Sequence, residues 1–501
     1  MPQPAPSSAT YDLLVIGGGI NGVGVARDAA GRGLSVLLVE KDDLASATSS
    51  ASSKLIHGGL RYLEQYEFRL VAESLAEREV LLRTARHLVW PARFVMPHVP
   101  ELRPRWMIRA GLFLYDHLTR RASLAGSNSV RLDRPPLSSG LKPEFRHGFE
   151  YSDCRVDDAR LVIANAMSAR KLGALILPRT ECLGARRDNG IWHATLAGGH
   201  QAAARAVVNA SGPWVKRTLN DRLAQPSADA VRMVKGSHIV LPQQYEGDHA
   251  FILQNDDRRV VFMIPYEGRF TLVGTTDVVV DEPANPRAAR EEIDYLCRAA
   301  NRYLAKPARA EEVLWHFAGV RPLYDDGSSD PSAVTRDYTL RVDDEAGRAP
   351  VLSVFGGKIT TYRRLAEHVV EKLQPYFAGC KGAWTASAAL VGSDFGAQGR
   401  EAARSALASR YPRIPGALMR ALFRRHGAKT ADVLGDAEKT ADLGEDFGGG
   451  LTERELAYFI EHEWASTADD VLWRRTKAGL QMSEAQRARV AQRMGEHAAA
   501  R

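Results

Sequence analysis

The clearest pattern of apolar and polar positions lies in residues 11–40, YDLLVIGGGINGVGVARDAAGRGLSVLLVE. Residues 13–16 are a short apolar run bounded by glycines, which is typical of a buried parallel strand. A helix is expected to follow as far as about Arg32, and residues 35–39 are a second apolar run that ends on Glu40. The pattern therefore predicts a strand–helix–strand unit near the start of the chain.

Further along, the apolar patterns predict a second α/β passage, a β-rich stretch and a helical end. Helices are expected at 69–87 and 157–172, where apolar residues recur at helical spacing. Residues 231–280 hold successive apolar segments that predict a mainly antiparallel sheet. Residues 351–355 are a short buried strand that runs into a pair of glycines and a further helix. Beyond residue 380, capping boxes and helix-stop signals predict a separate helical domain.

The first unit carries glycines at G-x-G-x-x-G spacing, at Gly17, Gly19 and Gly22. One glycine makes a tight turn, one lets the backbone approach a pyrophosphate, and one lets helix and strand pack closely. The helix N-terminus presents unpaired N–H groups and a positive dipole end to the phosphates. Glu40 follows about 20 residues later, where an acid accepts hydrogen bonds from a ribose. Dinucleotide binding is therefore predicted, with a purely structural turn as the alternative.

Composition and charge limit the remaining classes. At 501 residues, two or three domains are expected. The four cysteines are far apart and form no C-x-x-C, so neither a metal site nor a disulfide framework is predicted. No apolar run approaches the ~20 residues that span a bilayer, and residues 1–10 look like a loose tail rather than a signal peptide. The net charge of +7 favours anionic partners. No nucleic-acid partner is expected, because no basic run is interleaved with aromatic residues.

Several further stretches match one known family. They are TSSASSKLIHGGLRYLE, YSDCRVDDARL, NASGPWV, KGSHIVLP, GTTDV, GVRPL, TRDYTL and SVFGGKITTYRRLAEH, in addition to the glycine motif. In these stretches the chain resembles the FAD-dependent, respiratory (aerobic-type) glycerol-3-phosphate dehydrogenases. LGEDFG and DDVLWRRTKAGL look like the helical extension of that family.

The resemblance implies an α/β fold. A discontinuous Rossmann-type FAD-binding domain is expected, with a β-rich substrate domain of the glycine-oxidase and amino-acid-oxidase type and a C-terminal all-helical domain. The cofactor implied is FAD, held without a covalent link. The reaction implied is oxidation of sn-glycerol 3-phosphate to dihydroxyacetone phosphate, with electrons passed to a membrane quinone. A cytoplasmic enzyme bound peripherally to the anionic inner face of the cytoplasmic membrane is expected, and a homodimer is one option for its assembly.

These expectations divide the chain into consecutive segments. They are a flexible tail at 1–10, the first part of the FAD-binding domain at 11–90, a substrate or cap segment at 91–150, the second FAD-binding part at 151–225, the β-rich substrate domain at 226–320, the last FAD-binding part at 321–380 and the helical domain at 381–501.

The residues expected to hold FAD lie in the glycine motif, the ribose acid, the Ser-rich loop after it and two later glycine turns. They are Gly17, Gly19, Ile20, Asn21, Gly22, Glu40, Thr48, Ser49, Ser52, Ser53, Lys54, Gly58, Gly59, Ser211, Gly212, Gly357, Lys358 and Thr360. Hydroxyl and backbone N–H groups can hydrogen-bond a flavin ring and set its electron affinity. A solvated Ser-rich loop and a plain packing turn are the alternatives.

A phosphorylated substrate needs cations, and the bidentate fork of arginine suits a phosphate. The expected phosphate ligands are Arg61, Arg321, Arg336 and Lys358, against the alternative that such side chains are merely solvated. No metal ligand is predicted.

Arg321, His238 and Asp277 are the expected catalytic residues. A histidine with an ordinary pKa near 6.5 suits removal of a proton from a substrate hydroxyl. Because His238 lies in an apolar strand, a hydrogen-bonded core histidine is an equal alternative. Asp277 could orient the base, bind a substrate hydroxyl or simply form a turn.

Two rival functions and one ambiguous segment stay open. An amino-acid or amine oxidase of the same fold would use an arginine for a carboxylate and oxygen as acceptor. A non-enzymatic nucleotide-sensing or scaffold protein would hold a cofactor that no small substrate reduces. Residues 103–121 place an apolar, aromatic run between arginines, which predicts either a membrane-surface helix or a core helix.

Overall fold

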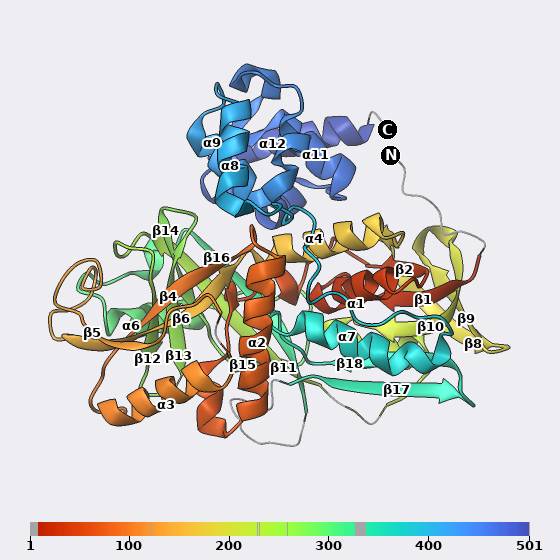
Figure 1. Cartoon of the computed structure of the whole chain (residues 1–501), viewed down its shortest axis with the longest axis horizontal. Coiled ribbons are helices and arrows are strands. Elements are labelled where there is room, and N and C mark those ends of the chain that lie inside the picture. The colour runs from red at the N-terminus through yellow and green to blue at the C-terminus, as the bar shows by residue number, and fades with distance from the viewer. Residues whose placement is uncertain are drawn as a thin grey trace.

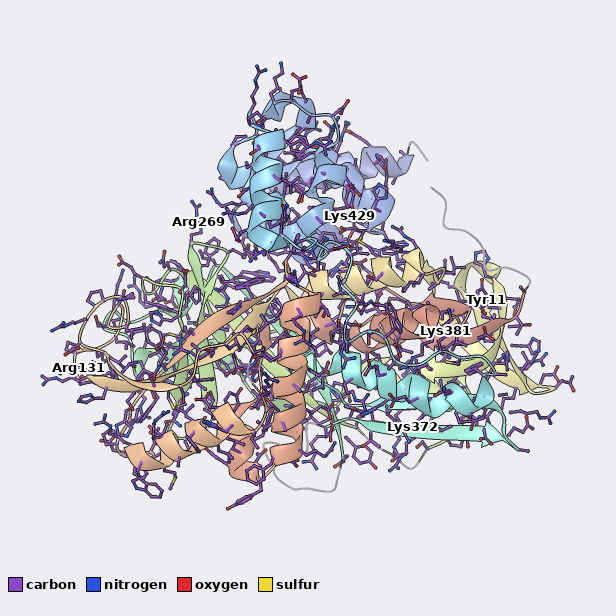
Figure 2. All side chains as sticks on the ribbon, in the orientation of Figure 1. Tyr11, Arg131, Arg269, Lys372, Lys381 and Lys429 are labelled. Atoms are coloured by element: carbon purple, nitrogen blue, oxygen red, sulfur yellow. The ribbon has the colours of Figure 1, made fainter. Side chains whose placement is uncertain are left out.

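Two β-sheets lie side by side in the molecule, and a helical domain sits along one edge of them (Figure 1). This computed structural model describes residues 9–120, 122–227, 229, 231–257, 259–325 and 337–499. In Figure 1 the sheet that contains β1 is on the right, the second sheet is on the left, and the helical domain, in blue, is above both. Basic residues such as Arg131, Lys372 and Lys429 lie on different sides of the molecule (Figure 2).

The first sheet has eight strands and a parallel centre. Its main path runs through β17 (Thr339–Glu345), β18 (Arg348–Phe355), β10 (Gln201–Asn209), β1 (Tyr11–Ile16), β2 (Val36–Val39) and β7 (Leu175–Leu177). Strands β8 (Cys182–Asp188) and β9 (Ile191–Leu196) continue from β10 as an antiparallel meander. Because β10 and β18 pair in parallel within the same sheet as β1, segments far apart in sequence form one Rossmann-type sheet, as predicted.

Helices cover one face of this sheet, and the meander covers the other. Helix α1 (Ile20–Gly31) contacts both α4 (Asp158–Lys171) and α7 (Tyr362–Leu373). The opposite face packs beneath β8, β9 and the helical turns α5 (Val215–Arg217) and η5 (Thr218–Arg222), around the fully buried Trp192. Residues 13–16 and 36–39 are all buried, as expected for parallel strands that are covered on both faces.

The second sheet has ten strands and is mainly antiparallel, as predicted. Its path runs through β15 (Val278–Val279), β11 (Val231–Pro242), β14 (Phe270–Gly274), β13 (Val260–Tyr266), β12 (Ala250–Gln254), β4 (Val89–Pro97), β6 (His147–Val156) and β3 (Leu55–Ile56). Strand β16 (Trp315–Tyr324) pairs with β11, and β5 (Asn128–Arg131) pairs with β6. The predicted boundaries at 150/151 and 320/321 fall inside β6 and β16, because alternating strands of similar composition give no sequence signal for the sheet to which each belongs.

Three further helices of the described chain accompany the two sheets. They are α2 (Phe68–Thr84), α3 (Arg105–His117) and α6 (Arg290–Asn301). Helix α2 is the one predicted at 69–87, and α3 lies within the ambiguous segment 103–121. In Figure 1, α3 and the start of α2 lie at the lower edge, opposite the helical domain.

The C-terminal domain is helical, with one small ribbon. Its helices are α8 (Gly399–Arg410), α9 (Gly416–His426), α10 (Thr430–Leu434), α11 (Glu453–His462) and α12 (Glu484–Ala499). Strands β19 (Asp446–Gly448) and β20 (Leu451–Thr452) form a two-stranded ribbon that the sequence did not predict. Its turn consists of glycines 448–450, all with positive φ, a conformation that glycine adopts without steric cost.

Buried ion pairs join this domain to the first sheet. Asp43, which follows β2, pairs with Arg474 at 2.6 Å and with Arg475 at 2.5 Å. Arg160 of α4 pairs with Glu463, and both side chains are almost fully buried. Removing one partner of such a pair leaves an uncompensated buried charge, so these contacts specify where the domain docks.

Candidate active site

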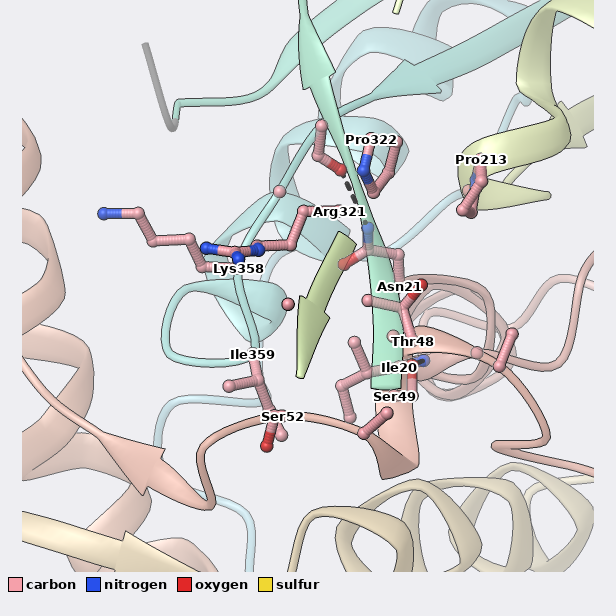
Figure 3. Close-up of a pocket in the computed structure, with 18 of the residues that line it drawn as sticks. Ile20, Asn21, Thr48, Ser49, Ser52, Pro213, Arg321, Pro322, Lys358 and Ile359 are labelled. Atoms are coloured by element: carbon pink, nitrogen blue, oxygen red, sulfur yellow. Dashed lines mark hydrogen bonds between the residues drawn. The ribbon is translucent and has the colours of Figure 1, made fainter. Parts of the chain in front are cut away.

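A cavity of about 690 Å³ lies where the two sheets meet. Its walls come from the loops that follow β1, β2, β10 and β18 and from strands β11 and β16. The volume is in the upper part of the ~300–1,000 Å³ range of small-molecule sites. In Figure 3 the side chains of Arg321 and Lys358 extend to one side of this cavity, away from Pro213.

Glycines shape the wall at the start of α1. Gly17 has φ +118°, and a Cβ there would lie 2.5 Å from the carbonyl oxygen of Ala210. A Cβ on Gly22 would lie 1.9 Å from the carbonyl oxygen of Gly17. Gly19 is the N-cap of α1, and Gly19, Ile20 and Asn21 all line the cavity, so the N-terminus of the helix lies at its wall. This backbone fits the pyrophosphate of a dinucleotide.

Glu40 is fixed by two backbone donors while it lines the cavity. Its Oε2 accepts a hydrogen bond from Gly18 N at 2.6 Å, and its Oε1 accepts one from Asp42 N at 2.8 Å. Burial raises the pKa of Glu40 above its ordinary value, and the two N–H donors oppose that rise. Each oxygen keeps a lone pair for a ribose hydroxyl.

The Ser-rich loop after Glu40 is ordered by side-chain hydrogen bonds rather than by solvent. Ser49 Oγ accepts from Ile20 N at 2.9 Å, and Thr48 Oγ1 donates to Val320 O at 2.5 Å. Ser53 Oγ lies 2.9 Å from His238 Nε2. The loop therefore links the dinucleotide end of the cavity to both β16 and β11.

Lys54 is a correction to the expected cofactor contacts. Its Nζ donates to Asp158 Oδ2 and to Ser50 O, both at 2.7 Å, and the side chain is buried outside the cavity wall. Ser52 Oγ donates to the same oxygen of Asp158 at 2.7 Å. The carboxylate of Asp158 attracts the ammonium group, so Lys54 supports the loop from behind.

Gly22 and Gly58 also lie behind the wall. Gly22 packs on Gly17, and Gly58 N donates to Tyr115 Oη at 2.9 Å. All other expected cofactor residues line the cavity: Gly17, Gly19, Ile20, Asn21, Glu40, Thr48, Ser49, Ser52, Ser53, Gly59, Ser211, Gly212, Gly357, Lys358 and Thr360.

Three of the expected phosphate ligands line the cavity. Arg321 pairs with Asp277 at 2.8 Å and donates to Thr276 O at 2.8 Å. Lys358 Nζ lies 4.0 Å from the ring centroid of Tyr62. Arg61 also lines the cavity. The fourth ligand, Arg336, lies outside the described residues.

His238 is buried and lies between its two neighbours in the sheet, Gly274 on β14 and Phe317 on β16. Burial first, and then the positive charges of Lys54 and Arg321, lower the pKa of His238 well below 6.5. The ring is therefore neutral near pH 7 and can accept a proton. Asp277 forms an ion pair with Arg321 at 2.8 Å.

Sequence reasoning assigned no role to several residues that the structure brings to the site. His57 and Tyr62 line the cavity, and Asp158 anchors the loop from below. His57 and Tyr62 lie within the stretch IHGGLRYLE, and Asp158 lies within YSDCRVDDARL. The motifs therefore carried the signal, but nothing in their spacing separated these residues from their neighbours.

Comparison with known proteins agrees with this geometry. The family model for FAD-dependent oxidoreductases matches residues 12–363, and that for the C-terminal domain of alpha-glycerophosphate oxidase matches 383–499. Glycerol-3-phosphate dehydrogenase of Pseudomonas aeruginosa is 54% identical over 97% of this chain and 96% of its own. D-erythritol 1-phosphate dehydrogenase of Brucella abortus is 51% identical over 96% of both chains.

A solved structure has the same arrangement. Glycerol-3-phosphate dehydrogenase from Bacillus halodurans, complexed with FAD, superposes with a TM-score of 0.72 and 27% identity, covering 98% of this chain and 95% of its own. The glycine cradle, the ribose acid and the size of the cavity fit the same cofactor, so the prediction of FAD is confirmed. The chain belongs to the FAD-dependent oxidoreductase family and groups with its glycerol-3-phosphate dehydrogenases.

Proposed function

We propose that this protein oxidises sn-glycerol 3-phosphate to dihydroxyacetone phosphate and passes the electrons to a membrane quinone. The observation that carries the proposal is the gathering of Arg61, Arg321 and Lys358 in the lining of one cavity that also holds a buried, neutral histidine. A dianionic phosphate needs several cations, whereas a single arginine is enough for the carboxylate of an amino acid.

The protein residues divide the work as follows. The glycine cradle, Glu40 and the loop 48–53 would hold FAD, which would supply the acceptor for the hydride from C2. His238 acts as the base that accepts the hydroxyl proton, and Ser53 Oγ, 2.9 Å from its Nε2, orients the ring. Arg321, oriented by Asp277, binds the phosphate through its fork, and Arg61 and Lys358 add charge.

D-erythritol 1-phosphate is a second candidate substrate. The relative named for that reaction is nearly as similar to this chain, at 51% identity, as the glycerol-3-phosphate dehydrogenase at 54%. Both substrates carry a phosphate ester on a polyol, so the same cations would serve either. Erythritol 1-phosphate is longer than glycerol 3-phosphate by one hydroxyl-bearing carbon.

Anaerobic reduction of the bound flavin tests these assignments. Glycerol 3-phosphate should bleach the flavin absorbance within seconds, and the rate constants for glycerol 3-phosphate and D-erythritol 1-phosphate rank the two substrates. A panel of amino acids with peroxide detection tests the oxidase alternative. If only an amino acid bleached the flavin, the phosphate assignment would be wrong.

The structure describes no helix that is both long and apolar enough to cross a bilayer. Helix α3 supports binding of the protein to the membrane surface, because one of its faces is buried in the protein and the other exposes apolar side chains. One face packs against the second sheet through Ile108, Leu112 and Tyr115. The other exposes four apolar side chains: Trp106, Met107, Phe113 and Leu114.

The neighbourhood of α3 extends this exposed surface. The turn η2 (Leu60–Gln65) contacts α3, and Tyr66 and Phe68, which follow it, are also exposed. Trp106 and Tyr66 are 70% and 80% exposed, which is unusual for large aromatic side chains. Arg105 is exposed at the start of α3, where it can meet anionic head groups.

Flotation with anionic liposomes tests this surface. Trp106→Asp with Phe113→Asp should lower partitioning at least tenfold, because each side chain buries apolar area worth about 1.5–3 kcal/mol. The matched control is Leu172→Asp with Leu183→Asp, two exposed apolar residues on the first-sheet side. If both double variants floated like the wild type, α3 would not be the anchor.

A further inference from the structure

One short turn of the C-terminal domain packs against a strand whose other end lines the cavity. The helical turn η10 (Asp470–Arg475) lies in the stretch DVLWRRTKAGL, to which sequence analysis assigned no chemistry. Its arginines reach Asp43 on the first sheet, as described above. Its tryptophan, Trp473, instead reaches the second sheet and stacks on Trp315 of β16, with ring centroids 4.8 Å apart and planes 15° apart.

From Trp315 the ring contacts continue to the candidate base. Trp315 lies 4.9 Å from Phe317, two residues along the same strand and therefore on the same face. Phe317 stacks on His238 at 4.9 Å, with planes 11° apart. Trp473, Trp315, Phe317 and His238 thus form a column of four rings that ends in the cavity, and we call it the ring column.

The cavity end of the ring column has little freedom. His238 lies opposite Gly274 on β14, and a Cβ on Gly274 would lie 2.1 Å from the imidazole ring. Ser53 Oγ lies 2.9 Å from Nε2. Phe317 stacks against the ring. The position of Phe317 therefore decides how far the imidazole can tilt.

The outer end of the ring column is also fixed. A Cβ on Gly479 would lie 2.8 Å from the ring of Trp473, so the chain passes close over the indole. Lys477 Nζ donates to Trp473 O at 2.6 Å. Lys477 lies in a small charged pocket together with Lys54 and Asp157, and Lys54 Nζ lies 4.8 Å from the ring centroid of Phe317.

We propose that Trp473 is a positioning residue for His238, so that the C-terminal domain sets the geometry of the reaction through the ring column. The inference rests on the proposed role of His238 as base. It assigns the docked helical domain a part in the reaction, because the domain supplies the outermost ring. A misplacement of about 1 Å at a reacting group can cost on the order of 100-fold in rate, so an unsupported column matters.

The test compares three variants of the full-length holoenzyme. Trp473→Ala removes the outer ring, and Trp473→Phe keeps a smaller ring. Trp464→Ala is the matched control, because Trp464 also lies at the domain interface, 4.5 Å from Arg170 of α4, but outside the ring column. Far-UV circular dichroism and FAD content establish that each variant is folded and loaded.

Two readouts separate the proposal from the proposed function. The first is a substrate-free NMR measurement of the imidazole Cε1–H signal of His238, in histidine-labelled protein, assigned by its loss in His238→Asn. Trp473→Ala should shift this signal and raise the pKa of His238 towards 6.5, since a loosened column admits water. Lys54 and Arg321 are the charged groups that act on this ring and are unchanged.

The second readout is anaerobic flavin reduction by glycerol 3-phosphate. Trp473→Ala should be slower by about tenfold with little change in substrate affinity, whereas Trp473→Phe and Trp464→Ala should stay within about twofold of the wild type.

The proposal is overturned if the His238 signal and the rate of Trp473→Ala match those of Trp464→Ala. If Trp473→Ala does not fold, Trp473→Leu against Trp473→Phe decides: equal His238 signals in the two refute a role of the ring. A wild type that glycerol 3-phosphate does not reduce refutes the proposed function, while the NMR comparison still decides the column.

Discussion

At the dinucleotide end of the cavity the walls are mostly backbone, whereas at the substrate end they are charged and aromatic side chains. Much of the dinucleotide end comes from one continuous unit, β1, α1 and β2, which supplies backbone N–H groups, glycine Cα atoms and one acid. The substrate end takes Arg61 from η2, His238 from β11, Arg321 from β16 and Lys358 from the turn after β18.

This difference has a physical consequence. At Gly17 and Gly22 an added Cβ would collide with the backbone, so this wall cannot accept a side chain there. Its geometry, however, does not depend on side chains from distant residues. A wall of side chains tolerates replacement but needs partners that hold each group in place. Asp277 for Arg321, and Ser53 and Phe317 for His238, are such partners. Variants at the two ends should therefore fail in different ways: the first lose the cofactor, and the second keep FAD and lose turnover.

The largest effect is expected from Gly22→Ala at the dinucleotide end. The added Cβ would lie 1.9 Å from Gly17 O, so the turn must open and the pyrophosphate site is lost. We expect protein purified without most of its FAD and destabilised by about 1–3 kcal/mol. Measurement of FAD released by heat, with a thermal melt, checks this. Gly495→Ala in α12, with open space at its Cβ, should keep its full FAD content.

The dinucleotide end was largely predictable from the sequence, because its signal is local. Apolar runs, glycine spacing and Glu40 all lie within thirty residues, and each has one steric or hydrogen-bonding reason. The late strand β18 was predicted from its apolar run, and the structure pairs it in parallel with β10, which pairs in parallel with β1. The position of Lys54 outside the cavity lining was not predictable, because its partner Asp158 lies 104 positions away and spacing cannot reveal such a pair.

The second largest effect is expected from His238→Asn at the substrate end. Loss of a general base costs on the order of 10²–10⁴-fold in rate, while FAD content should stay normal. Because the pKa of His238 is lowered well below 6.5, the neutral, active ring persists in mild acid, so kcat/KM of the wild type should not decline until the pH is below 6.5.

A pH profile of flavin reduction from pH 4.5 to 8 measures this limb. His316→Asn, on an exposed position of β16, is the control and should keep the profile of the wild type. An acid limb centred above pH 6.5, or a normal rate of flavin reduction by His238→Asn, would mean that His238 is a structural core histidine and not the base.

A smaller effect is expected from Arg321→Lys, which keeps the charge but loses the fork. The loss should be about 2 kcal/mol, or roughly 30-fold in kcat/KM, since truncation of a buried charged hydrogen bond costs ~2–5 kcal/mol and part of the charge remains. Asp277→Asn should raise KM as well, because Arg321 loses its orienting partner. Arg302→Lys changes a surface pair with Asp256 and should stay within about twofold.

The substrate end could be predicted only in part. Motif context supplied Arg61, His238, Asp277, Arg321 and Lys358, and the structure brings all five to one cavity. The neighbours of His238 could not be predicted from the sequence. They depend on the antiparallel register of β11 with β14 and β16, which places Gly274 and Phe317 on either side of His238. The ring column is a further case, since Trp473 and Trp315 are 158 positions apart in the sequence.

The smallest effect, and the sharpest test of the comparison, is expected from Glu40→Gln. Here the dinucleotide end depends on a side chain, and it should behave like the substrate end. Glutamine keeps one acceptor, but its NH₂ group must face either Gly18 N or Asp42 N, both of which are donors. We expect the affinity for FAD to fall by about 1 kcal/mol, or roughly fivefold, with normal turnover once FAD is saturating.

Since burial raises the pKa of Glu40 above 4.5, the wild-type carboxylate is protonated, and its affinity for FAD weakens, at a higher pH than for an exposed glutamate. FAD titration of apoprotein between pH 4.5 and 8 should therefore show a weakening on the acid side in the wild type, and a flat profile in Glu40→Gln. The exposed Glu438→Gln should follow the wild type. Equal profiles for wild type and Glu40→Gln would mean that the backbone alone sets affinity at this end.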